Sequence, residues 1–459
     1  MMKKPYPHQQ DVIDKVRRAF IGGHKSVLIQ ASPRFGKTVV SSNIIQSSQA
    51  KGTRVIFCVH RDNLINQTAN TFRDDDIDFG YIKSGMKYDP SKKVHIASVQ
   101  TLILRLDSVK CPDVFFVDEC QLAKSDSYDQ VISYFKAKGA LIIGLSGTPW
   151  RLDGRPLDEL FDTMVYGPSV RWLIDNKFLS DFKYYAPSVS EDFDKKLVGD
   201  AIHHYKKLAN GMLAIAYCIN RDHSKMVCDQ FLAAGIKAAH IDGTMNKDEL
   251  KAIYRDYGDR KIDVLCSISL ISEGFDLSAQ TGKDTTVECV IMLKRTKSLS
   301  SFLQMVMRCM TKKVGGGRSV IIDHGGNVFI HGMPDDDRNW SLAGRETGAD
   351  SNKRAEVEPP IICEDCFQAV VKPVPEFCPY CNAVMKKQKA VIKIIEGELQ
   401  EIKEAERLAI KEKLKQEERE AKTLNDMILV MTKKGSKNPV HAAKMKIQGR
   451  AARQARFKR

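Results

Sequence analysis

The chain has 459 residues, with 72 basic and 57 acidic side chains and a formal net charge of +15. Hydrophobic residues make up 43% of it, enough for sizeable cores, and the length suits roughly two to four domains. This composition excludes collagen-like, wholly disordered and small disulfide-scaffold proteins. No run approaches the ~20 apolar residues that span a bilayer, and the first residues lack the apolar core of a signal peptide, so we expect a cytoplasmic protein.

The positive charge gathers toward the C-terminal end. Residues 385–459 hold 21 basic and 10 acidic side chains, and residues 433–459 hold 10 basic side chains and no acidic one. Such an excess favours a polyanionic partner, with nucleic acid ahead of an anionic membrane. We expect residues 433–459 to form a basic tail that stays mobile until a polyanion neutralises it, and a merely solubilising tail is the alternative.

Short apolar, β-branched runs alternate with amphipathic stretches over much of the chain. Strands are expected first at residues 26–30, 54–59, 94–98, 113–117 and 140–145. A second series is expected at residues 214–217, 237–241, 264–267, 287–292 and 319–322. The alternation predicts an α/β fold with two parallel-sheet domains in tandem, at residues 1–165 and 185–335, and with ligands at the carboxyl ends of the strands.

The composition changes after the second predicted domain. Residues 344–360 are polar and end in two prolines, which indicates a linker. Residues 385–432 are rich in Lys and Glu, with apolar positions such as Ile395 and Leu399 at a helical spacing. We expect residues 385–432 to be a charged helical region, either packed on the body of the protein or forming a short helical hairpin or coiled coil.

Residues 361–384 contain two close cysteine pairs in a C-x2-C…C-x2-C pattern. The four cysteines are Cys363, Cys366, Cys378 and Cys381. Two such pairs suit tetrahedral Zn²⁺ bound by four thiolates, and a reducing compartment favours metal over disulfides. We therefore predict a four-cysteine zinc ribbon that holds Zn²⁺, with free thiols or redox chemistry as the alternatives.

Residues 31–38 predict a phosphate-binding loop. The segment follows a predicted strand, opens a helix and fits G-x-x-x-x-G-K-[ST] except at its first position. Backbone amides would cradle the phosphates of ATP, Lys37 would reach the β and γ oxygens, and the Thr38 hydroxyl would bind Mg²⁺. Nucleotide contacts are expected from the whole loop: Ala31, Ser32, Pro33, Arg34, Phe35, Gly36, Lys37 and Thr38.

A hydrophobic predicted strand at residues 113–117 runs into two adjacent carboxylates, Asp118 and Glu119. Asp118 would hold Mg²⁺ at the end of the strand, and Glu119 would orient and deprotonate the attacking water. A surface Asp-Glu turn is the alternative, and Lys37 and Thr38 upstream argue against it.

In these motifs the sequence resembles the DEAD/DEAH-box helicases of superfamily 2, in particular the compact phage and prophage type. The resemblance covers about residues 5–345 and follows the order of the family's motifs. It implies an ATP-binding RecA-like domain and a helicase C-terminal RecA-like domain, followed here by the zinc ribbon and a helical basic arm. A phage-encoded chain would work in the cytoplasm of the host cell.

The resemblance also implies roles for single residues. Gln9 is similar to the glutamine that reads adenine, Gln121 stands where the family senses ATP, and Ser146 and Thr148 look like the coupling motif. Further nucleotide contacts are implied for Gly274 and Asp276. Nucleic-acid contacts are implied for Arg61, Gln100, Thr101, Thr244 and Thr296.

The arginine-finger motif departs from the family pattern Q-x-x-G-R-x-x-R. The pattern maps onto Gln304, Met307, Arg308 and Thr311. The glycine and the second arginine are therefore missing, although one finger arginine can accelerate phosphoryl transfer by about 10³–10⁵-fold. Arg308 is expected to act alone, or with imperfect help from Lys312 or Lys313, because a point charge cannot reproduce the guanidinium fork.

These features together predict an ATP-dependent DNA helicase or translocase. It would couple ATP hydrolysis to movement on, and unwinding or remodelling of, single-stranded, duplex, forked or branched DNA. An RNA helicase is an alternative, because contacts to the phosphate backbone do not distinguish the sugars. A DNA-binding scaffold with a weak ATPase is another, suggested by Ala31, Gln121 and Thr311.

Overall fold

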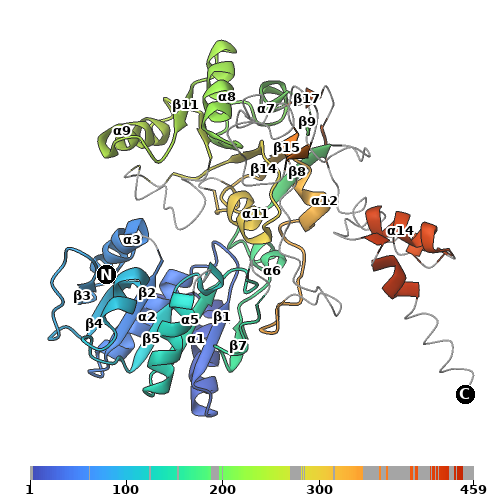
Figure 1. The fold of residues 1–459 in the computed structure, drawn as a ribbon. Helices are drawn as coiled ribbons and strands as arrows, with labels where there is room; N and C mark the ends of the chain where they lie inside the picture. The colour runs from blue at the N-terminus through green and yellow to red at the C-terminus, as the bar shows by residue number, and fades with distance from the viewer. Residues whose placement is uncertain are drawn as a thin grey trace, which may run out of the picture.

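The computed structural model describes residues 4–60, 62–122, 126–151, 155–187, 196–198, 200–268, 285–313 and 316–344, residues 281 and 283, and short segments between 361 and 447. Most of these residues belong to two α/β units in tandem, as the sequence predicts (Figure 1).

The first unit is a seven-stranded, fully parallel sheet in the order β3-β4-β2-β5-β6-β1-β7. Its strands are β1 (Ser26–Gln30), β2 (Val55–Val59), β3 (Phe79–Ile82), β4 (Val94–Ser98), β5 (Val114–Val117), β6 (Leu141–Ser146) and β7 (Thr163–Tyr166). Its helices are α1 (Pro7–Ile21), α2 (Lys37–Gln49), α3 (Asp62–Asp74), α4 (Val99–Leu102) and α5 (Asp126–Ala137).

Helices cover both faces of this sheet, which explains the unbroken apolar runs of its central strands. Val27 and Ile29 of β1 pack with α1, α2 and α3 on one face, whereas Leu28 packs with α5 on the other. Because neither face meets water, every residue of β1 is buried.

The second unit is a seven-stranded sheet in the order β11-β12-β10-β13-β14-β8-β18, parallel except for β18. Its strands are β8 (Phe182–Pro187), β10 (Ala214–Tyr217), β11 (Ala238–Ile241), β12 (Val264–Ser267), β13 (Cys289–Met292), β14 (Ser319–Asp323) and β18 (Leu399–Glu401). Its helices are α7 (Ala201–Ala209), α8 (Arg221–Ala233), α9 (Lys247–Gly258), α11 (Leu299–Val306) and α12 (Asn327–His331). A short helix, α6 (Val170–Asp175), leads from the first sheet to β8.

Two segments tie the units together. The connection after α6 pairs with the second unit through a bridge between Leu179 and Thr311. After α12, the chain returns to the first unit, where the rings of Trp340 and Trp150 lie 4.4 Å apart and Leu157 N–H donates to the Leu342 carbonyl over 2.6 Å. The two sheets are therefore held on either side of a shared apolar core.

The region expected to be helical, residues 385–432, is partly extended. β17 (Lys393–Ile395) pairs with β9 (Lys196–Val198), and β18 lies antiparallel to β8. The helical expectation is wrong for these two segments. The open edges of β9 and β8 offer backbone hydrogen bonds, and pairing with them is more favourable than the helix that the local apolar spacing predicts. Helix α14 (Leu424–Lys433) does lie in this region.

Part of the expected mobile tail is helical as well. Residues 442–447 form a helix whose Ala443 joins a small apolar cluster with Met427 and Val430 of α14. Lys446 pairs with Glu418, 2.6 Å apart, so one tail cation finds its counter-charge inside the chain.

The four cysteines of the predicted zinc ribbon lie outside the described residues. The strands that flank the first pair, β15 (Ile361–Ile362) and β16 (Ala369–Val370), pair in antiparallel fashion. Among the helices that the structure describes, none combines the length and apolar character needed to cross a membrane.

Candidate nucleotide site between the two domains

The predicted phosphate-binding loop connects β1 to α2. Gly36 caps the helix with φ +92°, and a Cβ there would lie 2.5 Å from the Gln9 amide nitrogen, so the position requires glycine. α2 begins at Lys37, whose Nζ donates to the Ala31 carbonyl over 3.2 Å. The exposed amides of the first turn of α2 therefore point toward an anion-binding position at the end of β1.

The loop residues divide into two groups. Pro33, Arg34, Gly36, Lys37 and Thr38 line a cleft between the two domains. Ala31, Ser32 and Phe35 are buried behind it. The Ser32 hydroxyl has no hydrogen-bond partner in the described part of the chain.

Gln9 fastens the start of α1 to the loop. Its side chain is only 4% exposed; its Oε1 accepts from the Tyr6 N–H and its Nε2 donates to the Phe35 carbonyl, both over 2.9 Å. Recognition of adenine by Gln9 stays a prediction. The structure shows in addition that Gln9 holds the phosphate-binding loop in place through the Phe35 carbonyl. The ring of Phe178, which the sequence did not single out, packs 4.2 Å from the ring of His8 and lines the cleft.

The acidic pair directly follows β5 and lies in the same cleft as Lys37. Burial and the neighbouring Glu119 raise the pKa of Asp118 to about 6, although Lys37 opposes this rise. Glu119 has φ +47°, an uncommon conformation outside glycine, and its carboxylate accepts from Gln121 Nε2 over 2.5 Å. The carbonyl oxygen of that amide, Gln121 Oε1, has no partner among the described residues.

The two predicted coupling residues lie at the end of β6, where Ser146 is the last residue of the strand and Thr148 follows it. Ser146 Oγ accepts from the Thr148 N–H over 3.0 Å, and the Ser146 carbonyl accepts from Ala31 N–H, also over 3.0 Å. Between them, a Cβ at Gly147 would lie 3.4 Å from Lys37 Nζ. The coupling motif therefore touches the phosphate-binding loop directly, although its proposed role remains a prediction.

The second domain contributes side chains from α11 and the turn after it. Gln304, Arg308, Thr311 and Lys312 line the cleft, whose volume is about 480 Å³, opposite Lys37. Arg308 is only 7% exposed. Burial raises the pKa of the Tyr217 phenol, and Arg308, which is hydrogen bonded to it, lowers it. Tyr217 at the end of β10 therefore helps to orient the candidate finger.

The two lysines considered as substitutes for the missing arginine differ. Lys313 is buried, and its Nζ donates to the carbonyls of Val287 (2.6 Å), Thr311 (3.2 Å) and Cys309. These carbonyls occupy its three N–H donors, so Lys313 is unsuited to a phosphate contact. Lys312 is exposed and lines the cleft.

In the first domain, two candidate nucleic-acid residues follow β4. Gln100 accepts from Ser98 Oγ over 2.6 Å and donates to the His60 carbonyl over 3.0 Å. Thr101 Oγ1 accepts from the Ser84 N–H over 3.1 Å. Gln100 is exposed, whereas Thr101 is buried, so only Gln100 presents its side chain at the surface.

In the second domain, Thr244 belongs to a network built on Asp242. Asp242 Oδ1 accepts from Thr244 Oγ1 and Oδ2 accepts from His240 Nε2, over 2.5 and 3.0 Å, and Arg221 Nε lies 2.8 Å from Oδ2. Hydrogen bonds from Thr244 and His240, with the nearby Arg221, hold the pKa of Asp242 well below its usual range. Arg221, the first residue of α8, was missed from the sequence, although it lies four residues after the end of a predicted strand.

Thr296 is held by α12. Its N–H donates to Asn327 Oδ1 over 2.9 Å, and its carbonyl lies 2.7 Å from His331 Nε2. Asn327 also donates to Asp323 Oδ1 and to the Lys294 carbonyl. Three further predicted site residues, Arg61, Gly274 and Asp276, lie outside the described residues.

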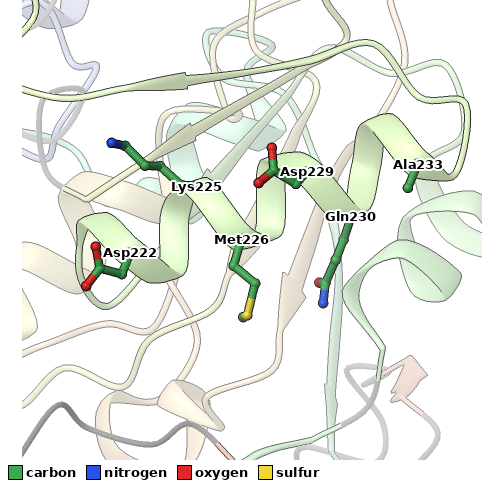
Figure 2. Close-up of a pocket in the computed structure, with 6 residues that line it drawn as sticks. All are labelled: Asp222, Lys225, Met226, Asp229, Gln230 and Ala233. Carbon is green, nitrogen blue, oxygen red and sulfur yellow. The ribbon is translucent and has the colours of Figure 1, made fainter.

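A second hollow, of about 540 Å³, lies on one outward face of α8 (Figure 2). It is lined by Asp222, Lys225, Met226, Asp229, Gln230 and Ala233. All six side chains come from one helix, and no other element that the structure describes contributes a lining residue, so this face lacks the two-sided arrangement of the cleft between the domains.

Comparison with known proteins agrees with this geometry. Residues 2–151 match the family described as "Type III restriction enzyme, res subunit", and residues 196–312 match "Helicase conserved C-terminal domain". A 51.5 kDa protein of Lactococcus phage (isolate 7-9) is 33% identical over 331 residues, which cover 68% of this chain and 68% of that protein. The putative ATP-dependent helicase IRC3 of Saccharomyces cerevisiae is 26% identical over 341 residues, which cover 66% of this chain and 48% of the yeast protein.

Among solved structures, the Type ISP restriction-modification enzyme LlaBIII shares the fold, with a TM-score of 0.53 and 17% identity over 70% of this chain and 28% of that one. This protein is therefore a two-domain α/β protein with a candidate nucleotide site between its sheets. It belongs to the superfamily 2 helicases, as its motifs suggested, and the phage relative is consistent with the compact phage type.

Proposed function

We propose that the protein is an ATP-dependent DNA helicase or translocase that hydrolyses ATP in the cleft between its domains. The observation that carries this proposal is the lining of that cleft. Lys37 and Glu119 of the first domain face it together with Gln304 and Arg308 of the second. A nucleotide bound there would touch both domains, so its γ-phosphate could hold them closed and hydrolysis would release them.

Within this cleft each side chain has a separate task. Lys37 and the amides of α2 bind the phosphates, while Glu119, oriented by Gln121, accepts a proton from the attacking water. Arg308 stabilises the charge that develops on the transferred group. Asp118 and Thr38 would hold Mg²⁺, which neutralises phosphate charge when bound. The raised pKa of Asp118 fits this role, because a divalent cation relieves the cost of a buried carboxylate.

Nucleic acid would lie along the polar residues after the strands of both sheets. Four side chains there are of the kinds that contact the phosphates and sugars of nucleic acid. They are Gln100 in the first domain and Thr244, Thr296 and Arg221 in the second. Repeated closing and opening of the cleft would then move the contacts of the first domain relative to those of the second along the nucleic-acid strand.

The positive charge supports a polyanionic partner, and one comparison favours DNA over RNA. The net charge of +15 includes a C-terminal region rich in Lys and Arg, which suits a polyanion of either kind. LlaBIII, which shares the fold, was solved bound to DNA. Forked or branched DNA as the preferred substrate, and a cytoplasmic location, are parts of this proposal.

The direct test is ATP hydrolysis measured with single-stranded, duplex and forked DNA beside RNAs of matched sequence and structure. We expect DNA to stimulate turnover and RNA to do so weakly. Stimulation by RNA alone would support the RNA helicase alternative. Binding of DNA with no hydrolysis under any condition would support the scaffold alternative.

A zinc ribbon at residues 361–384 is a further part of the proposal. It is supported by the C-x2-C…C-x2-C spacing and by the antiparallel pairing of β15 and β16 around the first cysteine pair. Zn²⁺ bound there would stabilise the fold of this segment, because metal binding and local folding are coupled.

A further inference from the structure

Arg34 occupies an unusual backbone conformation in the phosphate-binding loop. Its φ is +68°, in the left-handed region that favours glycine over residues with a Cβ. Five described non-glycine residues have positive φ, and two of them, Arg34 and Glu119, line the cleft between the domains. Strained backbone of this kind persists where the surrounding structure enforces it, and it is frequent at functional sites.

The charge of Arg34 acts on the second domain. Burial raises the pKa of the Tyr217 phenol and of the Cys309 thiol, and the Arg34 guanidinium opposes both rises. Burial lowers the pKa of Lys313, and the same guanidinium lowers it further. All three affected groups are buried residues around Arg308. Arg34 also lines the same cleft as Arg308, so its charge lies at the boundary with the second domain.

The second domain lacks one of the two positive charges that the finger motif would carry. Thr311 stands in the place of the second arginine, and it lines the cleft together with Arg34. Its backbone bridges to Leu179, and its carbonyl accepts from Lys313, which is engaged with three carbonyls. Among the described residues that line the cleft, the cations besides Lys37 and Arg308 are Arg34 and Lys312.

We propose that Arg34 supplies the second guanidinium of the nucleotide site from within the phosphate-binding loop, in place of the arginine missing at position 311. This inference rests on the proposed ATPase function. When ATP draws the domains together, Arg34 and Arg308 approach the transferred phosphate from opposite sides of the cleft. The planar fork of an arginine can bind two phosphate oxygens at once, which the ammonium of Lys312 cannot do.

Substitution of Arg34 separates a catalytic role from a structural one. Arg34→Gly removes the guanidinium and suits the left-handed backbone, so the variant should fold as well as the wild type. Arg34→Lys keeps a positive charge without the fork. Both should lower kcat of the DNA-stimulated ATPase by at least about tenfold, a fraction of what a finger arginine supplies. The affinity for ADP should stay within about twofold, because ADP lacks the phosphate that Arg34 contacts.

Restoring the arginine in the other domain provides the decisive comparison. In the double variant Arg34→Gly with Thr311→Arg, kcat should recover at least about fivefold over Arg34→Gly, because one trans-acting guanidinium replaces the other. Lys51→Ala, which removes an exposed cation outside the cleft, is the matched control and should keep the wild-type kcat.

The possible failures are distinguishable. If the wild type hydrolyses ATP and Arg34→Gly matches its kcat, the inference is wrong while the proposed function stands. A loss in Lys312→Ala with none in Arg34→Gly would likewise assign the second charge to Lys312. Failure of the double variant to exceed Arg34→Gly would also contradict the exchange between the two positions. A wild type that is inactive with every nucleic acid would contradict the proposed function and this inference together.

Discussion

Gln121 donates a hydrogen bond to the carboxylate of Glu119, with 2.5 Å between Nε2 and Oε2. The contact joins the candidate general base to the residue that stands where the resembled family senses ATP. Glu119 also has a left-handed backbone conformation. The Glu119 side chain is therefore held by its backbone at one end and by the hydrogen bond from Gln121 at the other. The carbonyl oxygen of the same amide, Gln121 Oε1, is buried and has no hydrogen-bond partner among the described residues.

Gln121→Ala should lower kcat for ATP by roughly tenfold and leave nucleotide affinity within about twofold, because it removes the orientation of the base and no phosphate contact. Steady-state kinetics and binding of a fluorescent ATP analogue measure the two effects. Gln67→Ala, at a glutamine that lines the cleft and is not bonded to Glu119 in any described contact, is the control and should keep wild-type kcat. Equal losses of affinity and turnover in Gln121→Ala would assign this residue to binding.

Arg308→Ala should lower kcat by about 10³-fold with a small change in ATP affinity, because the finger acts on the transition state. Lys313→Met should behave differently. The variant leaves three carbonyls, two of them in buried contacts, without their donor. It should lower the free energy of unfolding by about 2–3 kcal/mol and keep the rate of ATP hydrolysis. Wild-type turnover in Arg308→Ala would show that the finger has been misassigned.

Asp242→Asn should make the stability of the protein less dependent on pH. The pKa of Asp242 is held well below its usual range in the folded state, so ionised Asp242 stabilises the fold above its unfolded pKa of about 3.9. The variant should unfold about 1–2 kcal/mol more easily at pH 7, and the difference should shrink as pH falls below about 4. Urea unfolding of both proteins at several pH values measures this, and a difference that grows toward acid pH would contradict the network.

Zinc should be bound at about one ion per chain, and Cys363→Ser or Cys381→Ser should release it and expose residues 361–384 to proteolysis. Elemental analysis of freshly purified, reduced protein measures the content. Cys111→Ser, at a half-buried cysteine of the first domain, is the control and should keep the metal. No zinc in the wild-type protein would contradict the ribbon.

The central strands were predictable from sequence because helices bury both of their faces. Strands β1 and β4 begin and end at the residues predicted for them. The edge strand β3 was missed because its residues alternate between buried and half-buried positions and include a glycine. The extended segments 393–395 and 399–401 were mistaken for helix because their strand pairing depends on partners far away in the chain.

The candidate site was predictable in its motifs and less so in its contacts. Lys37, Asp118 and Arg308 meet in one cleft, as their motifs implied. The bond from Gln9 to the Phe35 carbonyl, and the packing of Trp340 against Trp150, were beyond sequence reasoning. Both depend on how separate elements approach one another, which no local pattern encodes.

The most direct test of the account compares ATP hydrolysis by the wild type and by Glu119→Gln at saturating DNA, with nucleotide binding measured on the same samples. We expect the wild type to hydrolyse ATP and Glu119→Gln to bind it with similar affinity but turn it over at least about 100-fold more slowly, because an amide cannot accept the proton. Lys37→Ala should lose turnover too, with weaker binding. Equal ATPase rates in the wild type and in Glu119→Gln would contradict the assignment of the catalytic cleft.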